Sequence, residues 1–286
     1  MTTSTPTAKA ARVFPPDLRR LVTSECASLS GSAVSTVALP TMAVLELHAS
    51  TTQIAALAFL GQLPNAVVAL PAGALSDRHA KRPQMIAADL TAAAVLATIP
   101  AAAFAGVLGI SQLYAVAVVL GITKIVHGAA SYLPVLVESH LLQRANSRLG
   151  AASAVADSAG SNVGAALVGA VGAARSLLVD VLSYLLSALL VWRIRAPEPV
   201  TAPSEGRRNL ARDIGEGLRF VVGQPTIRTV IAALSTLSFG LAIMNTYWAY
   251  YLLTDLRVSP TAFGVIMGVG GVGSLAGALL APRIAS

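Results

Sequence analysis

The 286-residue chain is 55% hydrophobic and only 12% charged, with a mean hydropathy of +0.71. Soluble domains carry roughly 25% charged residues, so this composition excludes an ordinary soluble protein and indicates a membrane protein. The net charge of +7 does not predict a nucleic-acid partner, because the basic residues are concentrated in loops between apolar runs. The polar segment 1–18 lacks the apolar core of a signal peptide, and we interpret it as a disordered tail.

Apolar runs long enough to cross a bilayer as helices follow this tail. Helices are the only open-ended structure that satisfies every backbone N–H and C=O group in hydrocarbon, so we expect an all-α integral membrane protein. The sequence predicts eight such spans, at 21–45, 52–75, 84–106, 111–136, 148–172, 174–193, 227–253 and 261–282.

The distribution of Lys and Arg orients the predicted spans. Seventeen of the 20 basic residues lie at the two ends of the chain, in the loops after spans 2, 4 and 6, or at the span ends beside those loops. The exceptions are Lys124, Arg175 and Arg257. An excess of Lys and Arg marks cytoplasmic loops. Both termini are therefore predicted to be cytoplasmic, in a multi-pass protein of the cell membrane.

The polar segment 194–226 separates six predicted spans from two. Its first part is rich in Pro, Glu and Ser, and apolar residues then recur at helical spacing between charges over 209–222. We interpret that second part as an amphipathic helix on the cytoplasmic membrane surface, with a simple solvated loop as the alternative. The predicted domains are thus the tail, a six-span bundle (19–193), this linker and an incomplete bundle of two spans (227–286).

The loop after the second span carries a dense cluster of charges that begins with a glycine. The members of this motif are Gly73, Asp77, Arg78, Lys81 and Arg82. The motif resembles the Gly-x-x-x-Asp-Arg-x-Gly-Arg-Lys/Arg signature that the major facilitator superfamily of secondary transporters carries between spans 2 and 3. Ala80 replaces the second glycine, and Asp89 in the third span matches many drug-efflux-like members. The resemblance implies that this loop is a gate.

The fourth and fifth spans extend the resemblance. Lys124, His127 and Gly128 are similar to the Arg-x-x-Gln-Gly pattern of proton-coupled drug antiporters, with the cation and the glycine at the same spacing. Gly160 and Gly164 match glycines of the span-5 antiporter pattern, although its proline is an alanine here. Glycines of this kind permit close helix packing. The sixth span and the linker resemble the macrolide- and siderophore-exporter branch.

The resemblance implies alternating access between two six-span halves, without a cofactor. We expect transmembrane transport of a small molecule, specifically proton-coupled efflux of a drug-like or amphipathic compound, by a protein that is not an enzyme. Its partners would be the lipid bilayer, the cargo and protons. Because the superfamily has twelve spans, the chain resembles a member truncated after span 8. The alternative is a non-transporting membrane fragment or a helical partner subunit.

Charged side chains inside the predicted spans are the candidates for coupling, because each costs roughly 2.5–3.5 kcal/mol near a helix centre. They are Glu25, Asp89, Lys124, Asp157 and Asp180. Lys124 and Asp157 have similar predicted depths, so we expect them to pair across adjacent helices. That pair either couples a proton to cargo or is a static structural ion pair. For Asp180, a structural pair with Arg175 is expected.

Two polar stripes are predicted to line a cavity. His127 follows Lys124 on one helical face, where it either lines the cavity or packs as an isolated histidine. Glu25, Ser28 and Ser32 recur at helical spacing in the first span, and Glu25 has a second option in pairing with Arg20. No second His or Cys has a spacing suited to a metal, so no metal site is expected.

Overall fold

The computed structural model describes most of the chain up to the seventh predicted span. The described residues are 16–76, 79–137, 142–196, 215, 219–250 and 256. They form helices and turns, and no strand occurs among them. Five of the helices are long and apolar enough to cross a membrane. The predicted all-α membrane fold is therefore confirmed.

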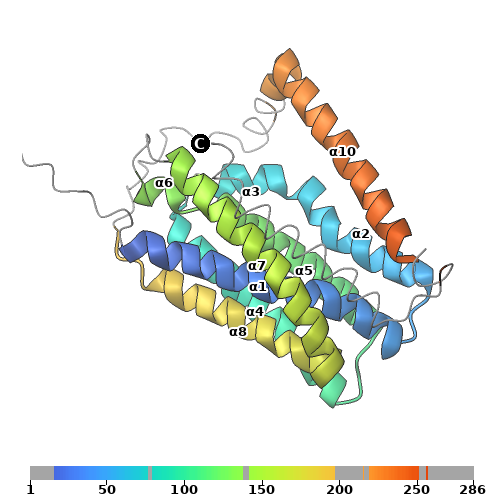
Figure 1. The fold of residues 1–286 in the computed structure, drawn as a ribbon. Helices are drawn as coiled ribbons and strands as arrows, with labels where there is room; N and C mark the ends of the chain where they lie inside the picture. Colours follow the sequence, from blue (N-terminus) through green and yellow to red (C-terminus); the bar gives the residue numbers. More distant parts are fainter. Residues whose placement is uncertain are drawn as a thin grey trace, which may run out of the picture.

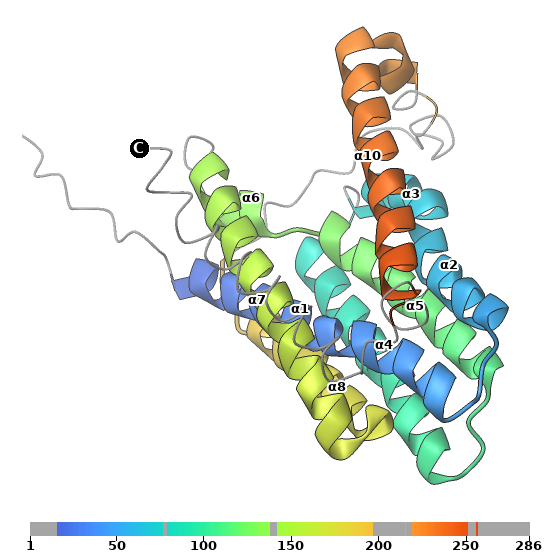
Figure 2. The ribbon, with the colours of Figure 1, turned by 45° about the vertical axis from the view of Figure 1, so that its right-hand side comes forward.

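A bundle of long helices makes up the N-terminal part of the chain (Figure 1). Its long helices are α1 (Pro16–Leu45), α2 (Thr51–Val67), α4 (Lys81–Phe104), α5 (Ile110–Ala129), α7 (Leu142–Val171) and α8 (Ala173–Trp192). Two short helices, α3 (Ala69–Ser76) and α6 (Leu133–Leu136), lie between them. The last described helix is α10 (Pro225–Tyr250). Its upper end projects beyond the bundle in Figure 1, and in Figure 2 its lower part overlaps α3 and α5.

Two predicted spans are interrupted in the structure. The run 52–75 is divided into α2 and α3 at Val68, because Pro71 has no N–H to donate to the carbonyl of Val67 four residues earlier. The run 111–136 ends as α5 at Ala129, and the chain turns before the short helix α6, which carries a proline in its first turn. Hydropathy could not predict either break, because the residues around both breaks are apolar enough to lie in hydrocarbon.

Helix α1 is at the centre of the packing. It packs along α7 and α8, while α4 packs on α8 and α5, and α5 packs on α2. The approach of α7 to α1 is close at two glycines: an added Cβ would lie 2.6 Å from the carbonyl oxygen of Ser30 at Gly160, and 2.8 Å from Cα of Val34 at Gly164. Glycine thus permits backbone contact between these helices.

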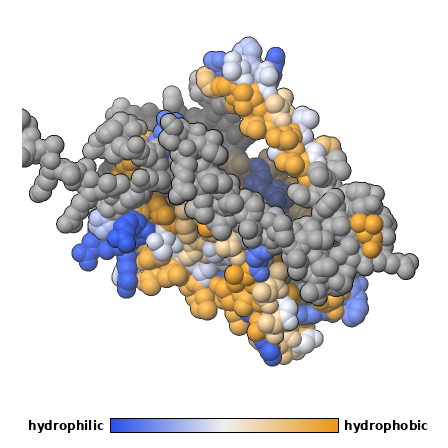
Figure 3. All heavy atoms as spheres, viewed as in Figure 1, coloured by the Kyte–Doolittle hydropathy of each residue, from blue (hydrophilic) through white to orange (hydrophobic). Residues whose placement is uncertain are grey.

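The outer surface of the bundle suits a lipid environment. Large apolar side chains on α8, such as Leu178, Leu182 and Leu186, are 40%, 63% and 45% exposed. Figure 3 shows apolar side chains over much of this face, with hydrophilic ones gathered toward its ends. In water such a surface would be costly, whereas in a bilayer it is solvated by lipid chains.

Candidate functional site

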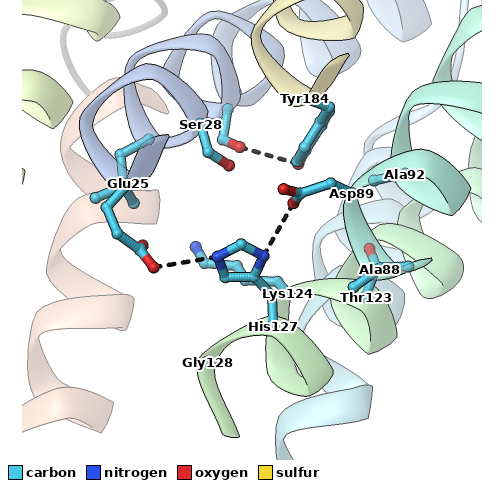
Figure 4. A pocket seen from close by; sticks show the side chains of 12 residues that line it. Glu25, Ser28, Ala88, Asp89, Ala92, Thr123, Lys124, His127, Gly128 and Tyr184 are labelled. Atoms are coloured by element: carbon cyan, nitrogen blue, oxygen red, sulfur yellow. Dashed lines mark hydrogen bonds and ion pairs between the residues drawn. The ribbon is translucent and has the colours of Figure 1, made fainter. Parts of the chain in front are cut away.

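A cavity of about 170 Å³ lies inside the bundle between α1, α4, α5 and α8 (Figure 4). It is lined by Glu25, Ser28, Leu29, Ser32, Ala88, Asp89, Ala92, Thr123, Lys124, His127, Gly128 and Tyr184. Pockets for drug-sized ligands measure about 300–1,000 Å³. In this conformation the cavity therefore has room for water or one small chemical group, and a larger cargo would require the helices to separate.

His127 joins two carboxylates across the cavity. Its Nε2 atom lies 3.1 Å from Oε1 of Glu25 on α1, and its Nδ1 atom lies 2.9 Å from Oδ1 of Asp89 on α4. Figure 4 shows the imidazole between the two acids. The Nε2 contact is an aligned hydrogen bond, whereas the Nδ1 contact has ion-pair distance without that alignment. An imidazolium can donate from both nitrogens, so two flanking carboxylates suit its charged form.

Asp89 is the most deeply buried member of this cluster, with 1% of its surface exposed. Its Oδ2 atom has no hydrogen-bond partner among the described residues. A buried carboxylate oxygen without a partner is costly, because the group has lost its hydration. The cluster therefore holds an acceptor that a proton or a donor group would stabilise.

Polar groups of α8 and α5 complete the wall of the cavity. The hydroxyl groups of Tyr184 and Ser32 lie 3.0 Å apart, which links α8 to α1. The Thr123 hydroxyl donates to the carbonyl of Leu120 on its own helix, and Lys124 lies exposed one turn before His127. The sequence analysis did not identify Tyr184 or Thr123 as cavity residues. The available indication was that Tyr184 lies one helical turn after Asp180 on α8.

The structure brings most of the predicted cavity residues together. They are Glu25, Ser28, Ser32, Lys124 and His127, joined by Asp89 from the predicted gate motif and by Gly128. The packing role predicted for Gly128 is not seen, since no described atom lies within 4 Å of a Cβ built there. Instead this glycine opens onto the cavity.

The predicted pair between Lys124 and Asp157 is not formed in this structure. The two side chains make no ion pair within the described part of the chain, and Asp157 is exposed on α7. The reason is lateral position: α5 packs on α2 and α4, whereas α7 packs on α1. Equal depth in the membrane did not make these helices neighbours.

Two further predicted partners are replaced in the structure. Arg20 does not pair with Glu25, because its Nη1 atom lies 2.5 Å from Oδ1 of Asp17. Asp180 does not pair with Arg175, which is exposed. Five residues on a helix turn through about 140°, so these two side chains leave α8 on different sides.

The gate motif is described only in part, because Asp77 and Arg78 lie outside the described residues. No described atom lies within 4 Å of a Cβ built at Gly73. Lys81 is the first residue of α4, and Arg82 donates a hydrogen bond to the carbonyl oxygen of Trp192 at the end of α8. The motif is thereby connected to the sixth long helix of the bundle.

Gln84 supports this loop, and sequence reasoning missed it. Its Nε2 atom donates to the carbonyl oxygens of Ser76 at 3.3 Å, His79 at 3.1 Å and Ala80 at 3.2 Å. The two hydrogens of one amide group are thus shared among three carbonyl oxygens at the end of α3 and in the turn that follows. The signal in the sequence was a glutamine in the first turn of α4, a position from which its amide group can reach the preceding loop.

Apolar helices packed around a buried, charged cavity define a class, the membrane transporters built from helical bundles. A family model for transmembrane secretion effectors matches residues 11–286. The chain belongs to this family within the major facilitator superfamily, whose members transport small molecules across membranes. A comparison with curated proteins gives no significant match. Among the described residues, no group of three His, Cys, Asp or Glu side chains could hold a metal ion.

Proposed function

We propose that the protein exports a drug-like or amphipathic compound by alternating access, and that protons drive the export through Glu25, His127 and Asp89. The observation that carries the proposal is the imidazole held between two carboxylates at the cavity wall. Charged groups are expensive inside a bilayer and mark ion and substrate pathways. Glu25, His127 and Asp89 are three such groups at the wall of one cavity. Binding of a proton there changes the net charge of the site at which the cargo would bind.

The charges around the cavity give the direction of this coupling. With His127 as imidazolium, its charge and that of Lys124 balance those of Glu25 and Asp89. Loss of one proton leaves the cavity with a net negative charge, which attracts a cationic or donor-bearing cargo. Return of the proton removes that attraction and favours release. Proton and cargo therefore compete as alternative positive charges beside the same carboxylates.

The orientation belongs to the proposal as well: both termini cytoplasmic, in the cell membrane. It is supported by the way basic residues meet at one end of the bundle. Arg20 donates to the carbonyl oxygen of Arg193 at 3.0 Å, and Arg82 donates to that of Trp192. The beginnings of α1 and α4 and the end of α8 thus share one basic face, as the positive-inside rule requires of a cytoplasmic side.

Efflux from cells that express the chain tests the proposal. We expect export of at least one probe from a set of ethidium, a macrolide and a siderophore, and we expect a protonophore to abolish it. His127→Asn should remove the export. The matched control is His48→Asn, which makes the same chemical change at an exposed loop residue with φ of 50°, a conformation that asparagine tolerates.

Three results would contradict the proposal. Export that survives the protonophore would exclude proton coupling. Equal export by wild type and His127→Asn would exclude the cluster as the coupling site. The absence of export for every probe would favour a membrane protein that does not transport on its own.

A further inference from the structure

A second acid is buried in the bundle outside the cavity. Asp180 on α8 is 0% exposed and lies at the interface with α1. Ser35 of α1 donates a hydrogen bond to its Oδ2 atom, and the Oγ atom of Ser183 lies 3.0 Å from its Oδ1 atom. Neither Asp180 nor these serines line the cavity.

No cation neutralises this carboxyl group within the described part of the chain. Helix α8 packs on α1, α4 and α7. The charged or titratable side chains that the structure describes on these helices, apart from those in the opening turns of α1 and α4, are Glu25, Cys26, Asp89, Asp157, Arg175 and Tyr184. None makes an ion pair or a hydrogen bond with Asp180, and Arg175 is exposed on another side of α8.

The hydrogen bonds around Ser183 point to a proton on Asp180. A serine hydroxyl has one hydrogen to donate. The Oγ atom of Ser183 lies 2.8 Å from the backbone carbonyl oxygen of Asp180, in the local side-chain to backbone contact common for serine in helices. One hydrogen cannot serve both oxygens, so the 3.0 Å contact with Oδ1 suits a neutral Asp180, whose Oδ1–H group would donate to Ser183.

Gly31 closes the space around this carboxyl group. A Cβ atom built at Gly31 would lie 2.6 Å from Oδ1 of Asp180 and would overlap the Ser183 hydroxyl. The backbone of α1 therefore lies directly on the acid. An ionised carboxylate in such a place would have neither a cation nor hydration, which is the costly case, whereas a neutral acid with hydroxyl partners is not.

We propose that Asp180 is a second proton-binding carboxyl group, protonated in this conformation. Ser183 is its partner on the same helix, and Ser35 of α1 bonds its other oxygen and so holds α1 against α8. The link of Asp180 to transport rests on the proposed function. Ser35 lies about 15 Å beyond Glu25 along α1, so the two proton sites occupy different depths of the bundle. When α1 separates from α8 and water enters, the Oδ1–H bond breaks, the proton passes to water and a carboxylate remains.

Infrared spectroscopy of the purified full chain in lipid vesicles at neutral pH tests this site. We expect wild type to show the C=O stretch of a protonated carboxyl group that is absent from Asp180→Asn and shifts in D₂O. Ser183→Ala keeps the acid and removes a partner, so the band should shift in frequency. Ser161→Ala removes a hydroxyl that, among the described residues, bonds a backbone carbonyl of α7, and it should leave the band unchanged.

The proposal would be overturned if wild type and Asp180→Asn differed only in ionised carboxylate bands. A band that Ser183→Ala leaves unmoved would overturn it too, and this comparison holds even if Asp180→Asn fails to fold. The measurement does not require transport. His127→Asn should retain the band, and its loss in that variant would show that Asp180 is not a separate site.

Discussion

Asp89 and Asp180 are acids on two packed helices, almost equally buried, in opposite surroundings. Asp89 faces a cavity, contacts an imidazole and keeps one oxygen without a partner. Asp180 faces no cavity, contacts hydroxyl groups on both oxygens and lies against the backbone of α1. Burial alone therefore does not decide what an acid does inside a bilayer.

The contrast separates two ways of keeping a carboxyl group in hydrocarbon. Pairing with a titratable cation beside a cavity leaves the acid able to exchange its proton and its partner. Enclosure by hydroxyl groups favours the neutral form and adds a contact between helices. The first arrangement suits coupling to cargo, and the second suits holding α1 and α8 together until they separate.

The largest effect is expected at the cavity acid. Asp89→Asn should lower proton-coupled export by about a hundredfold, because removing one partner of a buried charge pair costs about 3 kcal/mol or more and about 1.4 kcal/mol is a factor of ten. Asp157→Asn makes the same change at an exposed residue and should leave export within about twofold. Export assays on both variants check this. If both variants lost export to the same extent, the result would instead support the predicted role of the pair between Lys124 and Asp157.

A smaller effect, on stability, is expected at the enclosed acid. Gly31→Ala places a Cβ atom on Asp180 and Ser183, so the protein should lose about 1–3 kcal/mol and melt at a lower temperature in detergent. Gly128→Ala is the matched control at the cavity, where no described atom lies within 4 Å of the new methyl group. If both variants melted alike, the close packing of α1 on α8 would be disproved.

The sequence was sufficient for the all-α class and for single helical faces, but not for the breaks within the runs 52–75 and 111–136. Long apolar runs predicted the spans, and the spacing of Glu25, Ser28 and Ser32 predicted the polar face of α1 that lines the cavity. Lys124 and His127 were likewise placed on one face of α5. These features depend on the geometry of one helix, which is fixed by 3.6 residues per turn.

Contacts between helices could not be predicted in the same way. Depth in the membrane placed Lys124 level with Asp157, but which helices are neighbours depends on packing of small residues such as Gly31 and Gly160. The glycine spacing indicates that some helix approaches closely and does not say which one. For the same reason the contacts of His127 with α1 and α4 were not foreseen.

The central claim is that Glu25, His127 and Asp89 bind protons as one unit, and nuclear magnetic resonance of ¹⁵N-labelled histidine tests it directly. The chain has four histidines, and the His127 signal is identified by its absence from His127→Asn. Groups in contact titrate together. We therefore expect Glu25→Gln and Asp89→Asn each to move the titration midpoint of His127 while His48 stays unchanged. A His127 curve that is the same in all three proteins would contradict the claim.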